Sequence, residues 1–292
     1  MSNLTKNHII TAMQVTINPS PVEKAVRWLV PPSALAALSA FLYISPAGVF
    51  GKLDAVGYAV CHRIASRSFH IHDHQLPLCA RCTGEFMAAA LTLLFQIGFR
   101  GRRSRLPSRP IVAMLIVFAA AFIIDGSNSY LYLLKQTSES AFAGIPNLYI
   151  PNNTLRLLTG SGMGIALAAV LFPIINQTLW LEPDPRPALE WKQFLAMSIL
   201  VLVADLLVLT GLPVFLYPAA VLSVLGVLAL FVMVFGMLWI IIMHQDNTFN
   251  RVVDFWLPTL AGLSMCFMLI TGIDLLRFTL TGTWGGFPGI LG

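Results

Sequence analysis

Residues 215–243 read FLYPAAVLSVLGVLALFVMVFGMLWIIIM, a stretch without a single charged side chain. As a helix it is long enough to cross the hydrocarbon core of a membrane, which takes roughly 20 apolar residues. The rest of the chain has the same character: 57% of its 292 residues are hydrophobic, 11% are charged, and the mean hydropathy is +0.78. Soluble globular domains carry about 25% charged residues. The composition therefore excludes a soluble globular domain and indicates an integral membrane protein.

Further apolar stretches of similar length predict an all-α membrane protein with about seven transmembrane helices. The first stretch, 27–45, also fits a signal peptide, because Lys24 and Arg27 precede it. It is long and starts late, so we expect a helix that is retained in the lipid bilayer. The predicted spans are 27–45, 83–99, 110–127, 154–175, 190–212, 215–243 and 254–276.

These spans group into two predicted units. We expect a four-helix membrane unit over 27–175 and an appended three-helix unit over 190–292. Residues 1–26 are polar and are expected to form an N-terminal tail. Residues 176–189 are expected to be a linker, because they contain the proline-rich sequence Leu-Glu-Pro-Asp-Pro-Arg-Pro.

Basic residues predict the orientation. Lys and Arg near the ends of a span prefer the cytoplasmic side, and one short loop after the second span is dense in arginine. We therefore expect a multi-pass protein of the cell membrane with a cytoplasmic N-terminus and an extracytoplasmic segment between the first two spans. The net charge of +5 is accounted for by such topological charge, and we expect no nucleic acid as a partner. The arginines of this loop are Arg100, Arg102, Arg103, Arg105 and Arg109.

The segment between the first two spans contains residues 61–84, CHRIASRSFHIHDHQLPLCARCTG, with most of the cysteines and histidines of the chain. A Cys-x-x-Cys unit chelates one ion because both sulfurs can point at one centre from a tight turn. A second pair of ligands some 12–20 residues away completes a tetrahedral zinc site. The spacing predicts a metal site, with zinc as the ion, in a structural or catalytic role. The predicted ligands are Cys61, His62, Cys79 and Cys82, with His70, His72 or His74 as substitutes for the histidine.

Two other uses of these cysteines stay open. Cys79 and Cys82 have the spacing of dithiol oxidoreductases, and Arg81 between them would stabilise a thiolate. A membrane thiol-disulfide or quinone-linked oxidoreductase is therefore one alternative. The other is a non-catalytic subunit of a larger membrane complex, in which Cys61 forms a structural disulfide. That alternative implies other membrane subunits as partners.

Further polar residues are expected on the same side of the membrane. Ionisable groups at membrane depth are costly, so they usually pair or face a polar cavity. We expect Arg156 to pair with Asp125 or with Glu85, and Asp125 to end the third span ahead of a polar connection over 128–153. If the site is catalytic, Glu85 or Asp125 would serve as general base and Arg156 would bind an anionic group.

A set of short motifs runs along the first part of the chain: Cys61-His62, Arg67-Ser68-Phe69, Gln75-Leu76-Pro77, Cys79 to Gly84, Asp125-Gly126, Asn153, Arg156 and Thr159-Gly160. This set resembles the signature of the domain-of-unknown-function 2085 family of predicted prokaryotic membrane proteins. The resemblance covers about residues 45–175 and implies an integral membrane protein without implying an activity. The chain departs from the family near Asp73, where a glycine is usual, and at Glu85, where an apolar residue is usual, so neither need carry a family function.

Overall fold

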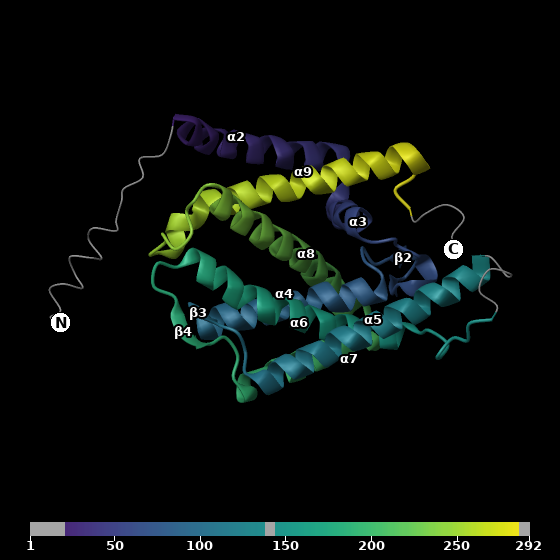
Figure 1. The fold of residues 1–292 in the computed structure, drawn as a ribbon. Helices are drawn as coiled ribbons and strands as arrows, with labels where there is room; N and C mark the ends of the chain where they lie inside the picture. The colour runs from purple at the N-terminus through teal and green to yellow at the C-terminus, as the bar shows by residue number, and fades with distance from the viewer. Residues whose placement is uncertain (1–20, 138–143, 286–292) are drawn as a thin grey trace.

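The structure, a computed structural model, describes residues 21–137 and 144–285 (Figure 1). Within these residues, seven helices are long and apolar enough to cross a membrane, which confirms the predicted all-α membrane fold. These helices are α2 (Pro21–Ile44), α4 (Ala80–Arg100), α5 (Arg109–Thr137), α6 (Asn153–Leu179), α7 (Trp191–Leu209), α8 (Pro213–Ile242) and α9 (Trp256–Thr281).

Short elements occupy the connections between these helices. They are α3 (Gly48–Val60), η1 (Ala65–Arg67), β1 (His70–Ile71), β2 (His74–Gln75), β3 (Arg103–Arg105), β4 (Asp184–Pro187) and η2 (Val252–Phe255). β1 and β2 form an antiparallel hairpin, whereas β3 and β4 pair in parallel.

The third spanning helix is longer than the sequence predicted. The predicted span ended at residue 127, before a polar connection, but α5 continues to Thr137. The reason lies in Asn128, whose amide nitrogen donates to the Tyr149 carbonyl (3.0 Å) while its oxygen accepts from the Leu148 amide (2.9 Å). The polar residues after 127 therefore continue the helix, with Asn128 holding the chain that returns toward α6.

The other boundaries shift as well. α6 runs to Leu179, into the predicted linker, because the buried Asn176 side chain donates to the carbonyls of Gly101 (3.1 Å) and Arg103 (2.8 Å). Within that linker, Asp184–Pro187 forms the strand β4. α2 begins at Pro21, and residues 1–20 of the predicted N-terminal tail lie outside the described residues.

The helices of the two predicted units contact one another extensively. α2 and α9 run side by side along one face in Figure 1, with the Phe41 and Phe267 ring centroids 5.0 Å apart. α8 packs against both α4 and α9, and α4 and α6 lie together in the middle of the bundle. The division into a four-helix and a three-helix unit stays a prediction about the chain.

Successive connections gather alternately at two ends of the bundle. At the cysteine end lie α3, the β1–β2 hairpin and the segments 144–152 and 282–285, where the Tyr58 hydroxyl donates to the Thr283 carbonyl (2.8 Å). At the arginine end lie β3, β4 and the segment 243–255, where the Leu181 amide donates to the Phe249 carbonyl (3.1 Å). All predicted site residues belong to the cysteine end.

The crossing of α4 and α6 sets the geometry of that end. A Cβ at Gly160 would lie 2.1 Å from the Arg81 carbonyl oxygen, and one at Gly164 would lie 2.0 Å from the Glu85 carbonyl oxygen. Glycines spaced by four residues allow two membrane helices to approach backbone to backbone. Because Arg81 and Glu85 flank Cys82, this contact fixes the first turn of α4 against α6.

We predict that Gly164→Ala destabilises the protein by about 3 kcal/mol, the upper part of the range for overpacking. The clash is with backbone, so no change of rotamer can relieve it. Gly98→Ala on the partner helix α4 is the control, because a Cβ there meets nothing within 4 Å. Thermal unfolding of the two detergent-purified variants checks this, and equal melting temperatures would refute the close crossing.

Candidate metal centre

Three cysteines from separate positions of the chain meet at the cysteine end. The sulfur atoms of Cys61, Cys79 and Cys82 all lie within 4.8 Å of one another. Cys61 is the C-cap of α3, Cys79 is the N-cap of α4, and Cys82 follows in the first turn of α4. All three are free thiols. The structure therefore brings together three of the four predicted ligands.

The backbone around the cluster favours negative charge on sulfur. Cys61 Sγ accepts hydrogen bonds from the amides of Cys79 (3.3 Å) and Arg63 (3.5 Å). The thiols of Cys79 and Cys82 also donate to it, and these hydrogen bonds hold the pKa of Cys61 well below its usual value despite burial. Donation to Cys61 is the main reason why the pKa of Cys79 rises to about 12. The N-terminus of α4, with its positive dipole end, lies beside all three sulfurs.

An apolar shell surrounds the three sulfurs. Cys61 belongs to a buried cluster that includes Leu78, Phe41 and Val224, and the half-buried Cys79 and Cys82 pack against it. The guanidinium of Arg277 donates to the carbonyls of Cys61 (2.7 Å) and Tyr58. Its positive charge therefore lies close to the cluster, where it offsets part of the charge that several thiolates would bring.

The histidines lie elsewhere. His62, His70, His72 and His74 are exposed, and none belongs to the three-sulfur group. His72 has a positive φ of 54° at the tip of the β1–β2 hairpin, so the backbone from His70 to His74 is not fully extended. His74 Nε2 instead lies 3.1 Å from Asp54 Oδ2. Participation of a histidine as the fourth ligand stays a prediction.

Polar side chains gather next to the cysteines, between α4, α5 and α6. We expected Arg156 to pair with Asp125 or Glu85, but Arg81 makes the ion pair with Asp125. Arg81 also donates to Ser129 Oγ (3.1 Å), so its guanidinium faces α5 and not the thiols as the sequence suggested. The Tyr149 hydroxyl donates to the other Asp125 oxygen (2.7 Å). Arg156 donates instead to Asn153 Oδ1 (2.8 Å).

Three arginines share this region with a single carboxylate partner. Arg67 donates to the Ser129 carbonyl (3.2 Å), and the pKa of Arg67 is lowered by burial and by the nearby charge of Arg81. Arg156 is 6% exposed and donates to Asn153 Oδ1 (2.8 Å), while its Nε is buried without a hydrogen-bond partner. The region therefore has positive charge in excess. Glu85 is half-buried and lies one turn along α4 from Arg81.

Sequence reasoning missed three of these residues. Arg67 stands in the segment that carries the family resemblance, which was the available signal, although its partner could not be read from the chain. Tyr149 and Arg277 act through contacts with Asp125 and with the Cys61 carbonyl, more than 20 residues away in each case. No local pattern in the sequence predicts such long-range contacts.

The fold and the site define a helical multi-pass membrane protein with a cysteine cluster at the N-terminus of one spanning helix. Comparison with known proteins is consistent with this. Residues 61–170 match the family described as "Predicted membrane protein (DUF2085)", which confirms the resemblance over that segment. An "Uncharacterized protein" of Methanothermobacter thermautotrophicus is 29% identical over 111 residues, 38% of this chain and 83% of that protein. No solved structure matches.

We predict that Asp125→Leu destabilises the protein by about 3 kcal/mol, because it leaves Arg81 without its carboxylate partner inside the bundle. Adding Arg81→Met should recover part of the loss, since both charges are then gone. The control is Asp184→Asn, which removes an exposed ion pair with Arg186 and should leave the unfolding transition unchanged. Chemical unfolding of the detergent-purified variants measures all three, and a double variant no better than Asp125→Leu would contradict the pairing.

Proposed function

We propose that the protein is a zinc-binding membrane protein whose metal site consists of Cys61, Cys79 and Cys82. The observation that carries this proposal is the mutual approach of three free sulfurs to within 4.8 Å at a helix N-terminus. Tetrahedral zinc with sulfurs at about 2.3 Å requires sulfur–sulfur separations of about 3.8 Å. Because the sulfurs already lie within 4.8 Å of one another, side-chain rotations that shorten their separations by up to about 1 Å would bring them to that spacing.

The number of ligands favours a catalytic role over a structural one. Structural zinc sites use four protein ligands, whereas catalytic sites use three and leave a position for water or substrate. The structure assembles three, and the histidines among the described residues lie outside the group. When bound, zinc would supply Lewis-acid polarisation of a substrate or a water of lowered pKa.

The neighbouring polar residues take different roles in this proposal. Glu85, one turn from Cys82 on α4, is the proposed general base. Arg156, buried and with an unpartnered Nε, is the proposed binding group for an anionic part of the substrate. Asp125 is held by Arg81 and Tyr149, so we assign it to positioning Arg81 and not to proton transfer.

Elemental analysis of detergent-purified protein tests the metal site. We expect about one zinc per chain, and its loss in Cys79→Ser and in Cys61→Ser because each removes a thiolate. Cys266→Ser is the matched control, since Cys266 is buried in the same apolar cluster but lies outside the sulfur group, and it should keep the metal.

Thiol counting on denatured protein distinguishes a metal site from a disulfide between the cysteines. A zinc protein without disulfides yields four reactive thiols after removal of the metal. Protein without zinc, in which two thiols react only after reduction, would overturn the proposal. It would leave two alternatives: an oxidoreductase that uses Cys79, the N-cap of α4, and Cys82 in its first turn, or a structural disulfide.

We further propose that the cysteine end is extracytoplasmic and that the N-terminus is cytoplasmic. The support is the concentration of basic residues near the arginine end. In a cysteine-free background, Asp73→Cys on the exposed β1–β2 hairpin should react with a membrane-impermeant maleimide in intact cells. Asp246→Cys, which is also exposed but lies at the arginine end of the bundle, should react only after permeabilisation. The reverse labelling pattern would invert the assignment.

A further inference from the structure

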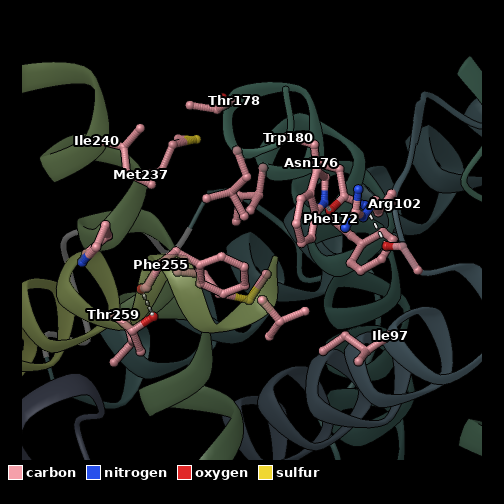
Figure 2. Close-up of a pocket in the computed structure, with 18 residues that line it drawn as sticks. Ile97, Arg102, Phe172, Asn176, Thr178, Trp180, Met237, Ile240, Phe255 and Thr259 are labelled. Carbon is pink, nitrogen blue, oxygen red and sulfur yellow. Dashed lines mark hydrogen bonds between the residues drawn. The ribbon is translucent and has the colours of Figure 1, made fainter. Parts of the chain in front are cut away.

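A cavity of about 530 Å³ opens at the arginine end, remote from the cysteines. Its walls come from α4, α6, α8, α9 and η2 and from the connections at Arg102 and Trp180, so it lies among the spanning helices near their arginine end. Most of the lining is aliphatic or aromatic, and Figure 2 shows Met237, Ile240 and Phe255 on the side that faces α8 and α9. The volume falls within the range of about 300–1,000 Å³ that is usual for small-molecule sites.

Three side chains with polar groups lie together on one side of this cavity. Figure 2 shows Arg102, Asn176 and Trp180 together there. The Arg102 guanidinium carbon lies 4.1 Å from the centroid of the Trp180 ring, and Trp180 Nε1 donates to Asn176 Oδ1 (2.9 Å). Since the Asn176 amide also donates to two carbonyls, its hydrogen-bonding groups are already used inside the protein. Arg102 is therefore the side chain at the cavity that can offer charge to a ligand.

Arg102 keeps its positive charge without a carboxylate partner among the described residues. It donates to the Asn250 carbonyl and stacks on Trp180, and it forms no ion pair with any described residue. Its neighbour Arg103 differs, because it pairs with Glu190 at 2.9 Å. The side chain of Arg102 is exposed, so its remaining donors can reach a group at the membrane surface.

We propose that this cavity binds an anionic phospholipid of the leaflet at the arginine end, with one acyl chain inside the cavity and the phosphate at Arg102. A carbon-lined void of this size forgoes dispersion contacts and does not favour water, so an apolar occupant is favoured. In a bilayer the apolar occupant at hand is an acyl chain. The uncompensated guanidinium at the mouth selects a negatively charged headgroup.

A second cavity provides an internal comparison. It has about 570 Å³ and lies between α4, α5, α6 and α8, and its lining side chains are apolar throughout. It can accept an acyl chain but has no charged group with which to choose a headgroup. Of these two cavities, only the one at Arg102 is therefore expected to select anionic lipid.

The test titrates detergent-purified protein with dioleoylphosphatidylglycerol or dioleoylphosphatidylcholine and records the melting temperature and the lipid affinity. We expect phosphatidylglycerol to bind about fivefold more tightly, the effect of one basic residue near a membrane surface. Arg102→Gln should abolish this preference, and Met237→Trp, which fills the cavity, should weaken the stabilisation by phosphatidylglycerol. Inorganic phosphate alone should have no effect, because it lacks the chain.

Arg186→Gln is the matched control. It removes one basic charge at the same end, on β4, without touching the cavity, and it should keep the preference. Equal affinity of the wild-type protein for both lipids would overturn the proposal, as would a preference that survives Arg102→Gln. Stabilisation by inorganic phosphate alone would also contradict it, because the site would then be a simple anion site. Zinc content should not change in any of these variants, so the result is independent of the proposed metal centre.

Discussion

The backbone contact between α4 and α6 determines where the chemistry of this protein can occur. Gly160 and Gly164 bring the two helices so close that the carbonyl oxygens of Arg81 and Glu85 occupy the space of two missing side chains. The first turn of α4 is thereby fixed, and its side chains Cys82 and Arg81 have different partners. Cys82 belongs to the sulfur cluster, and Arg81 belongs to the charged region beside α5. A looser crossing would leave neither side chain in a defined position.

The sulfur cluster and the arginine-rich region are complementary in charge. Thiolates in an apolar shell are costly unless they are compensated, and here the N-terminus of α4, the backbone amides of Cys79 and Arg63, and the Arg277 guanidinium provide compensation. A divalent cation would complete it. On the other side of the same helix turn, positive charge exceeds negative charge, which is a suitable environment for an anionic substrate close to a metal.

Much of this arrangement could be predicted from the sequence, because composition and apolar length determine membrane spans almost alone. The cysteines were predicted to converge because a Cys-x-x-Cys unit is a local pattern. The errors concern contacts between distant segments. The polar residues from Asn128 onward read as a loop, yet the Asn128 side chain binds the returning chain and the helix continues. The predicted partner of Asp125 was also wrong, because Arg81 forms the ion pair with Asp125 whereas Arg156 donates to Asn153.

Zinc-edge X-ray absorption spectroscopy on the purified protein tests the central claim most directly, because it reports the ligands of the ion themselves. The account predicts three sulfur neighbours at about 2.3 Å and one lighter neighbour at about 2.0–2.1 Å. Removal of His62 distinguishes an imidazole from a water or substrate oxygen at the fourth position. A spectrum with light neighbours only, or protein that contains no zinc, would contradict the account.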